Sequence, residues 1–205
     1  DSPNVLFIMM DDLGYGDISL NGSLIDTPNI DSIGENGAEL TNFYSSYSVC
    51  SPARFAALTG RYPYRGYADN VIYPTVQTIT PFAQTRIFNS IEMGNNADGM
   101  LGDEITIAEA FKAAGYNTGA FGKWHLGDYG EYLPTNQGFD YFYGYLCQRM
   151  AQCYFPPYLY NNDVREYTAN PKMELGDKLD VGADPYDIRS YDKFRGNAYS
   201  PDAIY

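Results

Sequence analysis

In residues 103–128, DEITIAEAFKAAGYNTGAFGKWHLGD, a helical pattern passes directly into a strand pattern. Apolar residues recur every three or four positions in the first half, which predicts one helix face made by Ile107, Ala110, Phe111 and Ala114. Gly115 is typical of a helix end. Residues 117–122, NTGAFG, then predict a short strand that ends at charged residues. A helix that leads straight into a strand indicates a fold in which helices cover a sheet.

The residues before this stretch alternate in the same way. The apolar run NVLFIMM, residues 4–10, predicts a strand buried on both faces. Residues 27–37 predict a helix, whose start and end are marked by Thr27, Pro28 and Gly37. Residues 38–47 predict a second strand, and residues 50–60, CSPARFAALTG, an Ala-rich helix. This order of elements predicts an α/β sandwich with a mostly parallel central sheet.

The remaining segments have no clear hydrophobic period. Residues 66–102 contain prolines and glycines throughout and predict a long irregular loop, of a size that is usually functional or mobile. From residue 146 to residue 205 the sequence is rich in Tyr, Pro and Asn, which indicates a loop-rich segment. A chain of 205 residues is long enough for one domain with a hydrophobic core.

Composition excludes several classes of partner. The chain has 13 basic and 26 acidic residues, a net charge of −13, and a surface this acidic repels nucleic acid. The longest apolar run, VLFIMM, is far shorter than a membrane span needs. The opening DSPNVLFIMM resembles a mature exported protein, so we expect a periplasmic or secreted location. Cys147 and Cys153 are close enough to form a disulfide in an oxidising compartment, and two buried thiols are the equal alternative.

Polar residues gather where ligands bind in α/β folds, beyond the carboxyl ends of strands. Asp11 and Asp12 directly follow the predicted first strand. Cys50 lies at a helix start, where the main-chain N–H groups favour an anion. Lys123 and His125 close the strand NTGAFG, and in an extended backbone their side chains point the same way, into one pocket, while Trp124 packs behind.

The residue types limit the chemistry of such a pocket. His125 is the single histidine, and the sequence has no Cys-x-x-Cys, no Gly-Lys-Ser phosphate loop and no Gly-x-Ser-x-Gly elbow. Two carboxylates without soft ligands indicate calcium or magnesium if a metal binds. Together with Arg54, Lys123 and protonated His125, they predict a pocket for a charged tetrahedral oxyanion.

At this point the sequence resembles a known family. Residues 50–61, CSPARFAALTGR, are similar to the Cys-x-Pro-x-Arg…Leu-Thr-Gly-Arg signature of the type I formylglycine-dependent sulfatases. The resemblance covers Asn4 to Tyr145, through separate blocks in the family's order: residues 4–17, 27–44, 50–61, 106–127 and 134–145. It implies an alkaline-phosphatase-like sulfatase fold, incomplete in this chain, and a sulfuric ester hydrolase acting on carbohydrate or aryl sulfates.

The resemblance also implies roles for individual residues. Cys50 would be oxidised to formylglycine, whose hydrate attacks the sulfur with one hydroxyl and expels sulfate with the other. Arg54 would steady the hydrate. Lys123 would neutralise a sulfate oxygen, and His125 would assist the second deprotonation, both of them also binding the substrate. A calcium ion would be held by Asp11, Asp12 and the modified Cys50.

The same resemblance implies partners, and alternatives stay open. The expected partners are a sulfated small molecule or glycan, the formylglycine-generating enzyme that reads Pro52 and Arg54, and the C-terminal part of the domain. In the family that part supplies further calcium ligands, a lysine and the histidine that protonates the leaving group, so residues 1–205 alone are expected to be inactive. The alternatives are a phosphonate or phosphate ester hydrolase of the same superfamily and a non-catalytic binding module.

Overall fold

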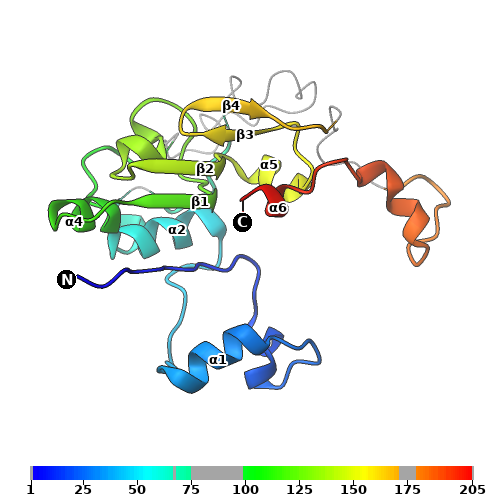
Figure 1. The fold of residues 1–205 in the computed structure, drawn as a ribbon, viewed down its shortest axis with the longest axis horizontal. Coiled ribbons are helices and arrows are strands. Elements are labelled where there is room, and N and C mark those ends of the chain that lie inside the picture. Colours follow the sequence, from blue (N-terminus) through cyan, green and yellow to red (C-terminus); the bar gives the residue numbers. More distant parts are fainter. Residues whose placement is uncertain (1, 67, 75–98, 171–178, 205) are drawn as a thin grey trace. The chain divides into compact units, whose positions relative to one another are not determined.

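The helix and the strand predicted in residues 103–128 both form. In the computed structural model, which describes residues 2–66, 68–74, 99–170 and 179–204, α4 covers Ile107–Ala113 and β1 covers Gly119–Lys123 (Figure 1). Thr106 caps α4: its Oγ1 accepts from the Glu109 N–H at 3.2 Å, and its own N–H donates to the Glu109 carboxylate at 2.8 Å. Ala108 is the buried residue of α4, whereas the apolar face made by Ile107, Ala110, Phe111 and Ala114 stays largely exposed.

The chain forms two compact units, Asp1–Ser45 and Ser46–Tyr205. The second unit contains a four-stranded sheet in the order β1-β2-β3-β4 (Figure 1), completed by β2 (Tyr141–Tyr145), β3 (Tyr158–Asn161) and β4 (Val164–Tyr167). β1 and β2 are parallel, whereas β2–β3 and β3–β4 are antiparallel.

The α/β class is therefore confirmed, but the sheet of the described residues is mixed rather than mostly parallel. The antiparallel pairing of β3 with β4 follows from the short connection between these strands. Between β3 and β4 the chain reverses over the two residues Asn162 and Asp163, and so short a turn joins only antiparallel strands. Asn162 has φ 56°, a left-handed conformation that asparagine tolerates well.

The two parallel strands approach each other closely at a pair of glycines. Gly122 and Gly144 are register partners, and a Cβ on residue 144 would run into the main chain of Gly122. A side chain at this position would force the strands apart. The pair therefore allows β2 to lie tightly against the end of β1, the strand whose last residue is Lys123.

The helix predicted at residues 50–60 is confirmed as α2, Cys50–Thr59. Gly60 ends it in a left-handed conformation, φ 67°, and its N–H bonds to the Ala56 carbonyl at 2.9 Å. α2 contacts α4 and buries Phe55 in the core of the second unit. The largest buried side chains in that core include Phe55, Met100, Trp124, Leu126, Phe142, Leu146, Tyr158 and Leu159.

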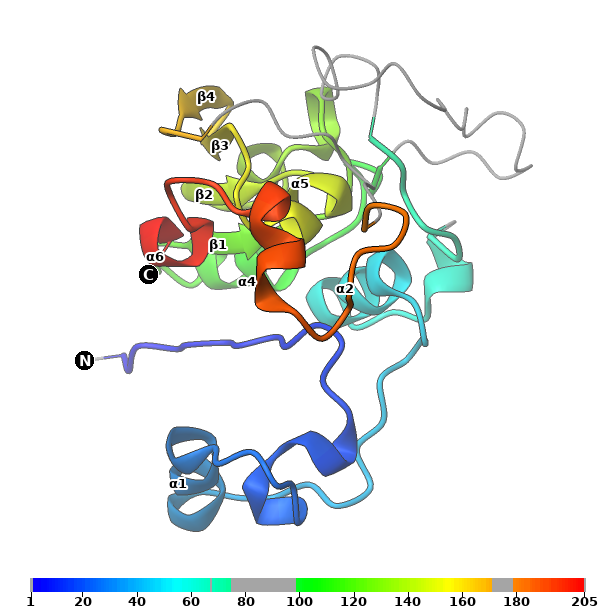
Figure 2. The same ribbon diagram turned by 90° about the vertical axis from the view of Figure 1, so that its right-hand side faces the viewer.

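The segment from residue 146 to residue 205 contains more regular structure than its composition indicates. Besides β3 and β4 it forms α5 (Gln148–Cys153) and α6 (Ser200–Ile204). α5 follows the end of β2 and contacts β1 and β2, and α6 contacts β1 (Figures 1 and 2). Short 3₁₀ helices cover Tyr15–Asp17, Ser19–Asn21, Pro63–Arg65, Gly130–Tyr132, Pro134–Asn136 and Ile188–Phe194.

In the first unit, the predicted helix forms and the predicted strands do not. α1 covers Pro28–Asn36, preceded by Thr27 and followed by Gly37 as the sequence indicates. Residues 4–10 and 38–47 form no strand, and the apolar side chains of the first run other than Met9 are exposed, Leu6 by 85%. A strand is stabilised through hydrogen bonds to a neighbour, and within the described part of the chain neither segment has a strand paired to it.

Most of the long loop predicted at residues 66–102 lies outside the described residues, namely 67 and 75–98. The described remainder, residues 68–74 and 99–102, contains no helix or strand. Met100 is nevertheless buried, and its N–H bonds to the Leu126 carbonyl at 2.9 Å. The end of this segment therefore packs against the chain that follows β1.

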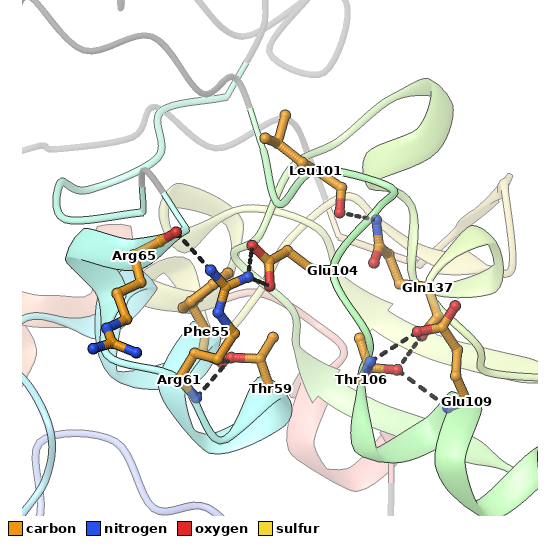
Figure 3. A network of polar contacts seen from close by, with 9 residues as sticks. All are labelled: Phe55, Thr59, Arg61, Arg65, Leu101, Glu104, Thr106, Glu109 and Gln137. Atoms are coloured by element: carbon orange, nitrogen blue, oxygen red, sulfur yellow. Dashed lines mark hydrogen bonds and ion pairs between the residues drawn. The ribbon is translucent and has the colours of Figure 1, made fainter.

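A partly buried ion pair joins the end of the cysteine motif to the residues before α4 (Figure 3). The Arg61 guanidinium donates to the Glu104 carboxylate and, at 2.7 Å, to the Arg65 carbonyl. Glu104 is only 5% exposed, so the Arg61 guanidinium supplies hydrogen bonds that water cannot supply at this position. The last arginine of the motif CSPARFAALTGR thus has a structural role in this chain.

Arg61→Ala is expected to lower the free energy of unfolding by about 2 kcal/mol, because it leaves the Glu104 carboxylate buried without its guanidinium. Arg61 is 45% exposed, so the expected loss of unfolding free energy is smaller than for a fully buried ion pair. Urea unfolding measures the change. The matched control is Lys112→Ala, which removes an exposed pair with Asp140 and is expected to cost less than about 0.5 kcal/mol. Equal losses in the two variants would contradict the structural role of Arg61.

Candidate active site

Cys50 lies where two helices begin. It is the first residue of α2, half-buried, and its Sγ donates to the side-chain carbonyl Oε1 of Gln148 at 3.3 Å. Gln148 is the first residue of α5, just beyond the end of β2. The sequence analysis did not identify Gln148 as a site residue. Its one signal in the sequence is its place just after a strand, because ligands in α/β folds bind beyond the ends of strands.

Arg54 connects α2 to the end of β1. It lies one helical turn after Cys50, and its Nη1 donates to the main-chain carbonyl of Lys123 at 2.5 Å. A hydrogen bond from a charged donor is stronger than one between neutral groups. This bond joins the cysteine-bearing helix to the main chain of the last residue of β1.

His125 departs from the geometry expected for it. Its backbone has φ 61°, a left-handed conformation, so the extended backbone from which Lys123 and His125 were predicted to point the same way does not reach residue 125. The His125 N–H bonds to the Leu146 carbonyl at 3.1 Å, and its ring Nε2 lies 2.8 Å from the Ile72 carbonyl. The ring is 1% exposed, whereas Lys123 is only partly buried.

Trp124 has the packing role expected of it. It belongs to the hydrophobic core, and its indole N–H donates to the Tyr132 carbonyl at 2.9 Å. Its main-chain N–H bonds to the Tyr145 carbonyl at 2.8 Å. Together with the His125–Leu146 bond, this contact continues the pairing of β1 with β2 beyond the strand ends and fixes the backbone that carries His125.

Asp11 and Asp12 belong to the first unit, whereas Cys50, Arg54, Lys123 and His125 belong to the second. Both carboxylates are exposed, and Asp12 has a left-handed backbone, φ 56°. Their oxygens are hard donors of the kind calcium prefers, but calcium takes 6–8 oxygens in general, so the pair fits only part of its shell. Within the described ranges, no group of three or more His, Cys, Asp and Glu residues gathers where it could hold a metal.

Cys147 is a buried thiol that forms no disulfide, which settles the alternatives for Cys147 and Cys153 in favour of thiols in this structure. Burial raises the pKa of Cys147 to about 11. The thiol therefore stays protonated at neutral pH and is a poor target for oxidation. Of the neighbouring residues at this helix start, Gln148 rather than Cys147 carries the polar contact to Cys50.

Sequence comparison identifies a family. The family model for sulfatases, described as "Sulfatase", matches residues 3–202. Human arylsulfatase A is 39% identical over 146 residues, which cover 69% of this chain and 25% of that enzyme. Mouse N-acetylgalactosamine-6-sulfatase is 35% identical over 157 residues, covering 76% of this chain and 27% of that enzyme. The chain thus spans about a quarter of the length of these curated relatives.

Comparison with solved structures agrees. A structure of a protein in complex with its substrate, D-glucosamine-2-N,6-O-disulfate, matches with a TM-score of 0.62 and 25% identity, over 83% of this chain and 28% of that one. A structure from a study of glycosaminoglycan metabolism by Bacteroides thetaiotaomicron matches with a TM-score of 0.56 and 29% identity, over 82% of this chain and 34% of that one. Among the described residues, no helix has the length and apolar character needed to cross a membrane.

Proposed function

Because this chain belongs to the sulfatase family, we propose that the protein containing it is a sulfuric ester hydrolase with Cys50 at its catalytic centre. The chain corresponds to about a quarter of its curated relatives. The activity therefore belongs to this chain together with the remaining part of the catalytic domain, and residues 1–205 alone are proposed to lack turnover.

The observation that supports this proposal most is the bond from Arg54 to the Lys123 carbonyl. It joins the helix that begins with Cys50 to the end of β1, so a group bound at Cys50 lies close to the segment that carries the Lys123 ammonium. A cysteine at a helix start, an arginine one turn later and a lysine at the adjoining strand end form a cationic setting. Such a setting suits a substrate with a charged tetrahedral group.

The chain's own residues then have separate roles. A formylglycine made from Cys50 would supply the nucleophile. Arg54 holds the start of α2 against residue 123, and the Lys123 ammonium binds a sulfate oxygen and counters its charge. His125, held in a fixed backbone conformation, accepts a proton.

Asp11, Asp12 and the modified Cys50 would hold calcium, which would supply positive charge toward the sulfate. Two carboxylates are hard donors of the right kind, and the other ligands would come from the rest of the domain. The proposed partner during maturation is the formylglycine-generating enzyme. The proposed location of the protein is periplasmic or secreted.

The proposed substrates are carbohydrate or aryl sulfates. Mouse N-acetylgalactosamine-6-sulfatase and the protein solved with a disulfated glucosamine carry names or titles that refer to sulfated sugars, which supports the carbohydrate class. The abundance of tyrosine, 21 residues, is compatible with contacts to sugar rings.

A paired assay tests the proposed reaction. The protein containing this chain and the rest of the domain, made beside a formylglycine-generating enzyme, is given nitrophenyl sulfate and nitrophenyl phosphate in parallel. We expect the higher kcat/KM for the sulfate ester, with sulfate ion released in equal amount to nitrophenol. A preference for the phosphate ester would indicate a phosphate ester hydrolase instead. Hydrolysis of neither ester, with the aldehyde present at residue 50, would overturn the proposal in favour of a binding module.

A further inference from the structure

The main chain of Ile72 lies between the cysteine helix and His125. The Ile72 N–H donates to the Ser51 Oγ at 3.0 Å, and the Ile72 carbonyl lies 2.8 Å from the His125 Nε2. Ser51 directly follows Cys50 in α2, and all three residues of this bridge, Ser51, Ile72 and His125, are buried. The contacts join positions that are 21 and 53 residues apart in the chain, so tertiary packing brings them together.

The contact to Ile72 fixes which ring nitrogen of His125 carries a proton. A main-chain carbonyl only accepts hydrogen bonds, so Nε2 must be the donor in this contact. In a neutral imidazole with its proton on Nε2, the nitrogen that can accept a proton is Nδ1. The position of the Ile72 carbonyl therefore selects Nδ1 as the basic nitrogen of His125.

Ser51 anchors the residue that carries this carbonyl. Ile72 lies in residues 68–74, which form no helix or strand, so no strand ladder holds its main chain. The Ser51 hydroxyl accepts the Ile72 N–H in a fully buried setting, and this bond anchors the residue whose carbonyl, in the next peptide group, contacts His125. His125 also has a left-handed backbone, a conformation that costs free energy and persists only where its surroundings hold it. These features together indicate a ring held in one defined orientation.

We propose that Ser51 is a positioning residue for His125: by anchoring the main chain of Ile72 it holds the histidine as the Nε2–H tautomer and leaves Nδ1 as the base. The use of that base in turnover rests on the proposed function, whereas the tautomer does not. Ser51, the second residue of the cysteine motif, would then position His125, which lies 74 residues later in the sequence, in addition to forming part of α2.

Nitrogen NMR of the ring tests this proposal. The protein is labelled with ¹⁵N-histidine and measured at about pH 8, where an ordinary histidine is neutral. The His125 signals are assigned by their loss in His125→Gln. We expect the two ring nitrogens to be well separated in chemical shift, with the attached proton on Nε2. A dominant Nδ1–H tautomer in the unsubstituted protein would overturn the proposal without any variant.

The variants separate positioning from packing. In Ser51→Ala the two nitrogen shifts are expected to converge as both tautomers become populated, and Ser51→Thr, which restores a hydroxyl, is expected to recover the separation. Ser200→Ala is the matched control, because it removes another buried serine hydroxyl, one that contacts Tyr145 and Tyr154. Unchanged shifts in folded Ser51→Ala, or the same convergence in Ser200→Ala, would contradict a specific role for Ser51. The spectra need no turnover, so a failed sulfatase assay and a failed tautomer test are distinguishable.

Discussion

Cys50→Ala is expected to lower the turnover of a sulfate ester by about 10⁴-fold or more in the protein that contains this chain and the rest of the domain. Alanine cannot be converted into an aldehyde, so the covalent route is lost while the first turn of α2 keeps a good helix former. Initial rates of nitrophenol release from nitrophenyl sulfate measure the effect.

The control for this variant is Cys153→Ala. Cys153 is half-buried at the other end of α5 from Gln148, and its replacement is expected to leave the rate within about threefold. Comparable rates for the Cys50 and Cys153 variants would contradict the assignment of Cys50 as the source of the nucleophile.

Lys123→Ala is expected to lower kcat by about 10²- to 10³-fold and to raise KM. The ammonium counters charge both when the sulfate ester binds and in the transition state, so both constants change. The design isolates the side chain, because Arg54 bonds to the main-chain carbonyl of residue 123 and this bond survives the substitution. A steady-state series over substrate concentration gives the two constants.

Lys112→Ala controls for the loss of one positive charge elsewhere. Its ammonium is exposed and pairs with Asp140, so kcat and KM are expected to stay close to those of the parent. If Lys123→Ala changed KM alone, the lysine would contribute to binding and not to the transition state. If it changed neither constant, the proposed contact with the sulfate would be wrong.

The helices could be predicted from the sequence because their signals are local. Pro28 at the start of α1, and Gly60 at the end of α2, act within one turn of the helix they bound. The packing of a helix depends on distant residues, and for that reason the spacing that predicted α4 does not tell that its apolar face stays largely exposed.

The strands were predicted less well because a strand depends on its neighbours. The apolar run at residues 4–10 has a strong strand pattern, yet the described residues pair no strand with it. β2, β3 and β4 were missed because their tyrosine-rich sequences, such as YFYGY in residues 141–145, show no clean alternation. In the structure these tyrosines and Gly144 form tight pairs with adjacent strands.

Only those parts of the candidate site that depend on the cysteine motif and on residue spacing could be predicted from the sequence. The clustering of Cys50, Arg54 and the end of β1 followed from a helix start and a strand end. The conformation of His125 did not, because a left-handed backbone at a histidine leaves no mark in the sequence. Its ring contacts Ile72, which is 53 residues away in the sequence, and Gln148 contacts Cys50 across 98 residues. A local sequence pattern does not reveal contacts over such separations.

The most direct test of the central claim, that Cys50 is the source of the catalytic nucleophile, is a mass spectrum of the peptide containing residue 50. The peptide is taken from protein that is active on a sulfate ester and was made beside a formylglycine-generating enzyme. The account predicts that the thiol has been replaced by an aldehyde that reacts with a hydrazide, in proportion to the specific activity of the sample. An unmodified Cys50 thiol throughout a sample with full sulfatase activity would contradict it.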